Sequence, residues 1–193
     1  GYVIKLLAIA KDDDGAIEAR VHPTMIPRRH VLASVGGALN AIYIHGEALG
    51  STMYIGQGAG QMPTATAVMA DILQIARDRR AGGDARPHSL GYPVSFIKRA
   101  RVKPMDDVVC EYYLRFMAED KPGVLGRIAS VLGRNGISMA SVIQHERSAG
   151  KTVPVVMRSH ETRERNLTRA LREIMRRKLV EAAPAFIRIE EQL

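Results

Sequence analysis

Apolar and polar positions alternate in two runs at the start of the chain, which predicts a β-hairpin. The runs are Tyr2–Lys11 and Ala16–Met25, and both carry residues that favour strands. Between them lies Asp12-Asp13-Asp14-Gly15, and Asp and Gly tolerate the positive φ angles of tight turns. The three aspartates lack the spaced ligands of a calcium loop, so a turn is favoured over a metal site. Pro23 and Pro27 are expected to bracket a bend.

The next stretch predicts a helical turn, a second hairpin and a helix. The short helical turn is expected at His30–Ser34. Asn40–Gly46 and Thr52–Ile55 are strand-like and are joined across Glu47–Gly50. A helix is expected from about Pro63 to Arg79, because proline suits a first helical turn. The helical positions that share one face are Val68, Ile72, Ile75 and, through its stem, Arg79.

The composition then changes, which suggests a boundary between two domains. Residues 80–93 are rich in Gly, Pro and polar residues and are expected to form an exposed loop. Val94–Lys98 is a candidate short strand. After Lys103–Asp107 the hydrophobic pattern restarts, so we expect domains at 1–107 and 108–193.

The second half shows the order β-α-β-β-α-β. Strands are expected at Glu111–Glu119, at Ile137–His145, at Thr152–Ser159 and at Phe186–Glu190. Thr162 is the expected cap of the second helix. Two right-handed crossovers place both helices on one face of a four-stranded antiparallel sheet. The expected fold class is therefore α+β, with a strand-rich first part followed by a ferredoxin-like domain.

The apolar periodicity predicts which side chains enter the core of this half. The expected strand face consists of Tyr112, Leu114, Phe116 and Ala118. The expected helical faces consist of Leu125, Ile128, Ala129 and Leu132, and of Leu167, Ala170, Leu171 and Ile174.

Composition and charge exclude several classes. Hydrophobic residues make up 46% and charged residues 25% of 193 residues, as in ordinary globular proteins, and no apolar run approaches the length of a membrane helix. One cysteine, Cys110, rules out an internal disulfide and suits a reducing cytoplasm; it is expected to be a buried structural residue. The six histidines lack metal-ligand spacing, so no metal is expected, and His22 is expected to make a structural hydrogen bond.

The net charge of +8 raises the question of nucleic acid as a partner. Basic residues cluster at Lys98–Lys103 and at Arg172–Lys178. The second cluster lies on a predicted helix whose apolar positions face the other way, which is typical of a solvated face. With no Trp and three Phe, the chain lacks base-stacking aromatic motifs, so no nucleic acid partner is expected.

A glycine-rich run, Gly56 to Gly60, follows a strand and precedes the Pro63 helix. Its spacing is G-x-G-x-G, not the G-x-G-x-x-G of a dinucleotide fingerprint, and no complete parallel βαβ unit surrounds it. Three glycines allow a ligand to approach the backbone closely, but a tight strand–helix turn without a ligand explains them equally well.

Residues 119–146, beginning EDKPGVLGRI, combine an acidic pair, Pro-Gly and an amphipathic helix that ends at Asn-Gly. Free N–H groups at the start of a helix suit a small anion. This stretch is similar to the start of an ACT domain, an amino-acid-sensing module. The resemblance implies an effector site in which Asp120 meets an ammonium group and the N–H groups of Gly123, Val124 and Leu125 meet a carboxylate. Weaker candidates at the other end of the helix are Asn135, Gly136 and Ile137.

A second resemblance covers nearly the whole chain. The segments Val21-His22-Pro23-Thr24-Met25-Ile26-Pro27, His30–Val35, Asn40-Ala41 and Gly56–Ala65 look like the late catalytic domain of homoserine dehydrogenase. That family interconverts aspartate 4-semialdehyde and homoserine with NAD or NADP, and threonine is its usual feedback effector. Gly58, Ala59 and Gly60 match the loop near the nicotinamide.

The same resemblance implies that this chain is a fragment without turnover of its own. The family's Rossmann domain, its catalytic lysine and its acidic residues precede the position of Gly1, so no catalytic residue is expected here and no cofactor is expected to stay bound. The implied partners are further copies of the chain, as a dimer or tetramer, and an amino-acid effector, which the family's usual pattern gives as threonine. The alternative is a non-catalytic amino-acid-sensing and oligomerisation module.

Overall fold

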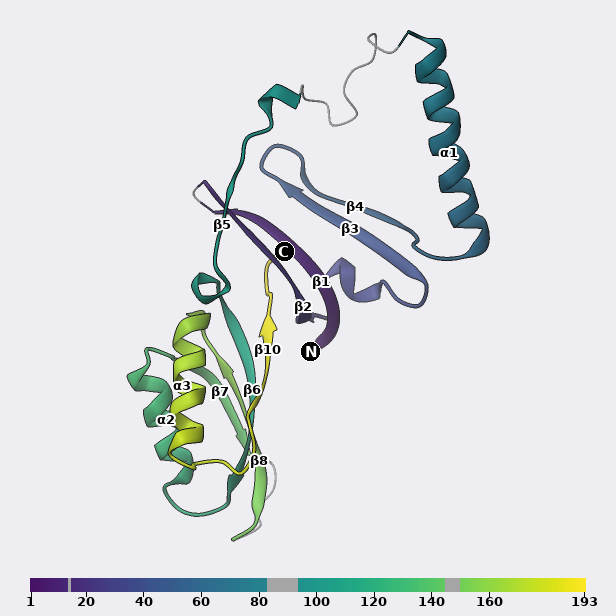
Figure 1. Cartoon of the computed structure of the whole chain (residues 1–193). Coiled ribbons are helices and arrows are strands. Elements are labelled where there is room, and N and C mark those ends of the chain that lie inside the picture. Colours follow the sequence, from purple (N-terminus) through teal and green to yellow (C-terminus); the bar gives the residue numbers. More distant parts are fainter. Residues whose placement is uncertain (14, 83–93, 145–149) are drawn as a thin grey trace. The chain divides into compact units, whose positions relative to one another are not determined.

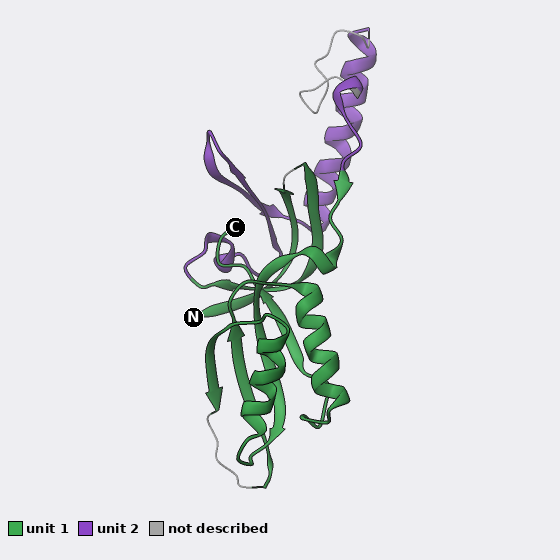
Figure 2. Cartoon of the chain, turned by 90° about the vertical axis from the view of Figure 1, so that its left-hand side faces the viewer, with its two compact units in different colours: residues 1–28, 101–193 green, residues 29–100 purple. Residues whose placement is uncertain are grey.

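The computed structural model describes residues 1–13, 15–82, 94–144 and 150–193, and it separates the chain into two units. The first unit contains residues 1–28 together with 101–193, and the second contains residues 29–100 (Figure 2). The first unit is discontinuous in sequence because its sheet joins strands from both ends of the chain. The compact units do not follow the predicted boundary at 107/108, and the division into a catalytic-domain part and an ACT domain at that point stays a prediction.

The first unit is built on an eight-stranded sheet with α2 (Val124–Arg134) and α3 (Glu164–Arg176) packed on one face (Figure 1). The strands follow the order β1-β2-β10-β6-β8-β7, with β5 beside β2 and β9 beside β6. Their bounds are β1 Tyr2–Asp13, β2 Ala16–Pro27, β5 Arg101–Val102, β6 Val109–Glu119, β7 Met139–Gln144, β8 Thr152–Ser159, β9 Thr162–Arg163 and β10 Ala185–Ile189. The order β10-β6-β8-β7 and the two helices confirm the predicted α+β, ferredoxin-like arrangement.

The first hairpin is confirmed, but its predicted bend is wrong. Strand β2 pairs antiparallel with β1 over its whole length, from Ala16 opposite Asp13 to Pro27 opposite Tyr2. Pro23 lies inside this ladder opposite Leu6. Both prolines are accommodated because the fixed φ of proline is compatible with extended backbone. The turn itself includes residue 14, which lies outside the described residues.

Strand β6 forms the centre of the hydrophobic core. Tyr112, Leu114 and Phe116 have no exposed surface, and Ala118 is 2% exposed, which confirms the predicted face. The two helices bury their apolar stripes against this strand and its neighbours. The buried helical side chains are Val124, Ile128, Val131 and Leu132 in α2, and Leu167, Ala170 and Ile174 in α3, with Leu171 partly buried.

Two details of the helices differ from the prediction. Leu125, at 37% exposure, and Ala129 point away from the core, because α2 turns the face that begins at Val124 toward the sheet. Thr162 is not the cap of α3: it belongs to β9, where it pairs with Cys110, and the N-cap position is Arg163. A backbone bond from Glu164 N–H to the Val108 carbonyl (2.9 Å) satisfies one of the donors that a cap would serve.

The second unit contains a hairpin and a long helix. The predicted helical turn is confirmed as the 3₁₀ turn η1 (Val31–Ser34), which is capped by His30, and β3 (Leu39–Gly46) pairs antiparallel with β4 (Gly50–Gln57). Helix α1 (Gln61–Arg80) confirms the predicted helix, but its expected face is not buried in the described structure: Val68, Ile72 and Ile75 are all at least half exposed.

Three predictions fall at the edges of these elements. The expected strand at Val94–Lys98 is wrong, since residues 94–96 form a 3₁₀ turn, η2, which lacks the paired strand that extended backbone requires. The predicted loop falls mostly on residues 83–93, and the turn between β7 and β8 on 145–149; both segments lie outside the described residues. Within the described part of the chain, no helix combines the length and the apolar character needed to cross a membrane.

Candidate functional site

The glycine-rich loop connects β4 to α1 in the second unit. A Cβ atom on Gly58 would lie 1.7 Å from the Asn40 Nδ2 atom, so any side chain at position 58 would collide with this amide. Gly60 has φ +132°, which L residues rarely adopt, and its carbonyl accepts a hydrogen bond from the Thr64 N–H at 3.0 Å. Gly58, Ala59 and Gly60 are all exposed. The local geometry thus accounts for both glycines, and it leaves the backbone of the loop open to solvent.

The loop before α2 joins the end of β6 to the start of the helix. Its backbone is tied to the far end of the β7–β8 hairpin, because Asp120 N–H donates to the Lys151 carbonyl at 2.8 Å. The Asp120 carboxylate accepts a hydrogen bond from Gln144 Nε2 at 3.1 Å. Gly123 occupies the N-cap position with φ +85° and provides no side-chain cap. Asp120 and Gly123 are therefore brought together at the positive end of α2.

In the first turn of α2, the expected N–H donors differ in whether they already make a hydrogen bond. Val124 N–H already donates to the Lys121 carbonyl at 3.2 Å, and the Val124 side chain is 5% exposed, so this residue belongs to the core. The Leu125 side chain is 37% exposed at the surface. Among the described residues, no backbone carbonyl accepts a hydrogen bond from the N–H groups of Gly123 and Leu125, the other two predicted donors.

The other end of α2 is an Asn-Gly cap of Schellman type. Gly136 has φ +74° and donates to the Gly133 carbonyl at 2.9 Å, while Ile137 N–H donates to Leu132 at 3.1 Å. Asn135 Nδ2 donates to the Val131 carbonyl at 2.9 Å and to Glu173 on α3 at 3.2 Å. Ile137 is 3% exposed in the core. These groups close the helix and tie it to α3.

The length of α2 keeps the two predicted effector groups apart. The helix contains 11 residues, which at 1.5 Å each amounts to about 16 Å. One small amino acid does not span that distance. Within one chain, the Asp120 loop and the Asn135–Ile137 cap are therefore two separate places.

Sequence reasoning missed a buried cluster of charged side chains between β2 and β10. Arg20, whose side chain is 1% exposed, donates to Glu18 Oε1 at 2.8 Å and to Glu190 Oε1 at 2.5 Å. Lys11 adds a second partner to Glu190 at 2.7 Å. Arg20 also contacts the His22 ring at 3.0 Å. We refer to Lys11, Glu18, Arg20, His22 and Glu190 as the β2–β10 ion cluster.

The signal for this cluster was present as polar residues at every second position of β2. Glu18, Arg20, His22 and Thr24 are all buried, whereas the intervening Ala19, Val21 and Pro23 are exposed. Alternation predicts two different faces, and the usual expectation is that the apolar face is the buried one. Here the polar face is buried, and its charged Arg20 pairs with Glu190, which directly follows β10.

The pKa directions agree with structural roles for His22 and Cys110. Burial and the charges of Arg188 and Arg20 lower the pKa of His22, whose Nδ1 lies 3.0 Å from Thr24 Oγ1; the expected structural hydrogen bond is confirmed. Burial raises the pKa of the Cys110 thiol to about 11, which disfavours the nucleophilic thiolate.

A second buried group anchors α3 to the sheet. The Tyr112 hydroxyl donates to Glu164 Oε2 at 2.9 Å, and Arg188 Nε donates to the same oxygen at 2.8 Å. Burial raises the pKa of the Tyr112 hydroxyl well above its ordinary value, so it remains a donor. Among the described residues, no three His, Cys, Asp or Glu side chains are grouped to hold a metal ion.

Comparison with known proteins identifies what this architecture is similar to. Residues 1–73 match the family model described as homoserine dehydrogenase, and residues 112–178 match the ACT domain. A homoserine dehydrogenase from Neisseria gonorrhoeae is 38% identical over 190 residues, which are 98% of this chain and 44% of that protein. A homoserine dehydrogenase from Helicobacter pylori is 37% identical, over 98% of this chain and 43% of that protein.

Solved structures show the same correspondence. The crystal structure of a homoserine dehydrogenase from Thiobacillus denitrificans superposes with a TM-score of 0.87 and 38% identity, covering 99% of this chain and 43% of that one. A homoserine dehydrogenase from S. aureus shares the fold, with a TM-score of 0.59 and 24% identity, over 100% of this chain and 43% of that one. The chain thus spans less than half the length of the relatives it matches.

Proposed function

From the premise that this chain belongs to the homoserine dehydrogenase family and carries an ACT domain, we propose that it serves an amino-acid-regulated, NAD- or NADP-dependent homoserine dehydrogenase. That enzyme transfers a hydride between the nicotinamide and the carbonyl carbon of aspartate 4-semialdehyde, and homoserine is the alcohol on the other side of the reaction. The observation that carries this proposal is the match over 98–99% of the chain, through both units.

The role we propose for the second unit is to contribute a backbone surface to the cofactor pocket. Gly58, Ala59 and Gly60 are exposed and carry almost no side-chain bulk, so a planar ring can approach the peptide groups. The catalytic proton transfer is assigned to none of the residues of this chain.

For the ACT domain we propose binding of an amino-acid effector, with threonine as the first candidate. The loop supplies an acceptor for the ammonium group in Asp120, and the N–H groups of Gly123 and Leu125 lie at the positive end of α2 for the carboxylate. Because Asp120 already accepts from Gln144, effector binding exchanges one hydrogen bond for a charge-assisted one. Asn135, Gly136 and Ile137 are proposed only as a contribution from a paired copy.

Calorimetric titration with threonine tests the effector site. The wild-type chain is expected to bind in the micromolar-to-millimolar range, and Asp120→Asn is expected to weaken binding about tenfold or more, since it removes the charge that meets the ammonium group. Glu161→Gln, an exposed residue in the same unit, is the matched control and is expected to bind as wild type. Equal affinities for all three proteins would remove Asp120 from the site.

A second experiment separates the enzyme from the alternative, a non-catalytic sensing and oligomerisation module. The test of catalysis is homoserine-dependent reduction of NAD or NADP, followed at 340 nm on a protein that carries this chain. Threonine-sensitive turnover is the expected result. Threonine binding without any turnover or affinity for NAD(P)H would favour the sensing module.

We propose that copies of the chain associate through the exposed face of the β1–β2 hairpin. Within its unit this face is apolar on both strands: Ile4, Leu6 and Val21 are 57%, 74% and 69% exposed, and Ala8 and Pro23 lie between them. Large apolar patches mark association surfaces. Light scattering is expected to show a dimer or tetramer for wild type and a smaller species for Leu6→Lys. An unchanged mass for Leu6→Lys would reject this face.

A further inference from the structure

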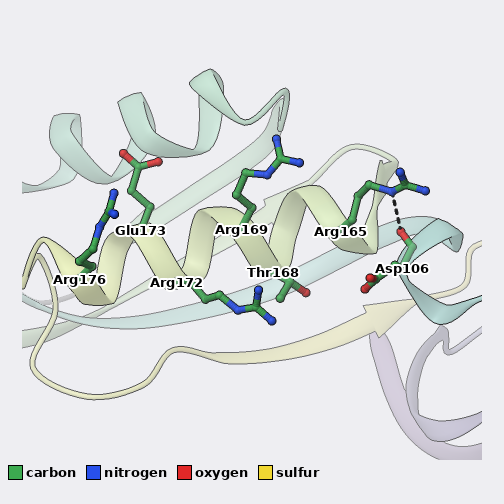
Figure 3. A pocket seen from close by; sticks show the side chains of 7 residues that line it. All are labelled: Asp106, Arg165, Thr168, Arg169, Arg172, Glu173 and Arg176. Carbon is green, nitrogen blue, oxygen red and sulfur yellow. Dashed lines mark hydrogen bonds between the residues drawn. The ribbon is translucent and has the colours of Figure 1, made fainter.

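The outer side of α3 forms a groove of about 510 Å³ lined with arginines (Figure 3). Its lining consists of Asp106, Arg165, Thr168, Arg169, Arg172, Glu173 and Arg176. The arginines recur at i, i+4, i+7 and i+11, and at 100° per residue they lie within an arc of about 60° on the helix. All four are exposed, whereas Leu167, Ala170 and Ile174 bury the opposite face.

Two acidic side chains near this groove, Asp107 and Glu173, are already engaged in ion pairs. Arg165 forms an ion pair with Asp107, and its Nε atom approaches the Asp106 carbonyl at 3.5 Å. Glu173 accepts from Arg177 at 2.6 Å and from Arg134 at 3.2 Å. These contacts lower the pKa of the Glu173 carboxylate, with the Asn135 hydrogen bond as the main cause. The negative charge of Glu173 is therefore already paired with Arg134 of α2 and with Arg177 at the end of α3.

Three guanidinium groups remain for a ligand. For Arg169, Arg172 and Arg176, the described part of the chain provides no ion-pair partner within 4 Å. Seven residues separate the first from the last, which corresponds to about 10 Å along the helix. Figure 3 shows Arg172 and Thr168 directed to one side of the helix and Arg169 to the other, and all three side chains line the groove.

We propose that this groove binds a compact oligophosphate, a small molecule with two or more linked phosphate groups. Several guanidinium forks and one hydroxyl, from Thr168, are donors that match phosphate oxygens, and Arg makes paired hydrogen bonds to such groups. The groove has the volume of a small-molecule site rather than of a protein interface. The site is separate from the Asp120 loop, and it does not depend on the proposed enzyme activity.

The lining argues against nucleic acid as the occupant. Single-stranded nucleic acid is held by aromatic side chains that stack on bases, and no aromatic residue lines this groove. Duplex DNA is bound through charges spread over many phosphates, whereas Arg169, Arg172 and Arg176 cover only about 10 Å of the helix axis. Nucleic acid is therefore an outcome to be tested.

The test is calorimetric titration of the full chain with sodium tripolyphosphate at 0.15 M salt. Saturable binding is expected, with a stoichiometry of one ligand per chain. The double variant Arg169→Gln/Arg172→Gln is expected to bind at least tenfold more weakly. Arg169→Lys/Arg172→Lys keeps the charge but loses the forks, and it is expected to fall between the two.

The matched control is Arg115→Gln, which removes one charge from an exposed position on β6. It is expected to bind as wild type, and far-ultraviolet circular dichroism verifies that every variant is folded. The absence of saturable binding overturns the proposal. So does an equal loss of affinity for Arg115→Gln and for the single variants Arg169→Gln and Arg172→Gln, because the attraction would then be a general effect of net charge. A short DNA duplex that binds more tightly than tripolyphosphate and displaces it also overturns the proposal, in favour of nucleic acid.

Discussion

Replacement of Arg20 by methionine is expected to destabilise the first unit by several kcal/mol. The Arg20 side chain is 1% exposed, and it is paired with Glu18 and Glu190, whose side chains are 8% and 5% exposed. Methionine fills a similar volume but leaves two carboxylates without their central partner. Breaking a buried pair from one side costs about 3–5 kcal/mol.

The surrounding lysines place the expected loss at the lower end of that range. Lys11 stays 2.7 Å from Glu190, and Lys103 lies 3.8 Å from Glu18 with 19% of its side chain exposed. Both carboxylates therefore keep one cation, and we expect a loss of about 3 kcal/mol. For a chain of this size that corresponds to a fall in melting temperature of about 6–12 °C.

Urea denaturation followed by circular dichroism, with calorimetry for the melting temperature, measures this loss. Arg115→Met on the exposed side of β6 is the control, and it is expected to change stability by less than about 0.5 kcal/mol. The triple variant Arg20→Met/Glu18→Gln/Glu190→Gln removes the unpaired charges and is expected to recover part of the loss. A loss below about 1 kcal/mol for Arg20→Met would refute the reasoning, because it would mean that water reaches the cluster.

Two further predictions concern one thiol and two glycines. Because the pKa of Cys110 is raised from 9.0 to about 11 in the folded chain, the stability that its thiol contributes is present below pH 9 and is lost as the pH rises toward 11. Cys110→Ser is therefore expected to flatten this part of the pH–stability curve. A disulfide reagent at pH 8 is expected to label the wild-type thiol only after denaturation. Gly136→Ala is expected to lower the free energy of unfolding by about 1–2 kcal/mol, because the cap requires φ +74°. Gly126→Ala lies inside α2 with no atom within 4 Å of the added Cβ, and it is expected to raise the free energy of unfolding by about 0.5–1 kcal/mol. Equal effects of the two variants in urea denaturation would contradict the assignment of the α2 cap.

Local patterns were sufficient for most elements of the ACT domain. Alternation at Tyr112, Leu114 and Phe116 identified the central strand, and helical spacing identified α2 and α3, because each pattern reports one face against one core. The wrong predictions concern residues whose local structure is set by a partner far away in the sequence. Thr162 was expected to cap α3, but its pairing with Cys110 in β6 places it in a strand.

The candidate sites divide in the same way. The Asp120 loop, the Gly58–Gly60 loop and the Gly136 cap are all marked by residues whose local geometry needs them, so they are visible in sequence. Whether two of these sites share a ligand depends on the distance between them. The 11 residues of α2 place the Asp120 loop and the Asn135–Ile137 cap too far apart to share one small amino acid within a chain. The basic cluster Arg172–Lys178 is visible in the sequence, but the engagement of its Arg177 by Glu173 is not.

Most of the elements, the fold class and the family follow from the sequence, because they depend on short-range periodicity and on motifs that survive at 38% identity. Which face of β2 is buried becomes visible only in the folded chain. That choice depends on β10, which joins β2 in parallel from more than 160 residues away and brings Glu190 to Arg20. An alternating strand specifies that it has two faces, but the partners that reach it across the chain determine which face loses its water.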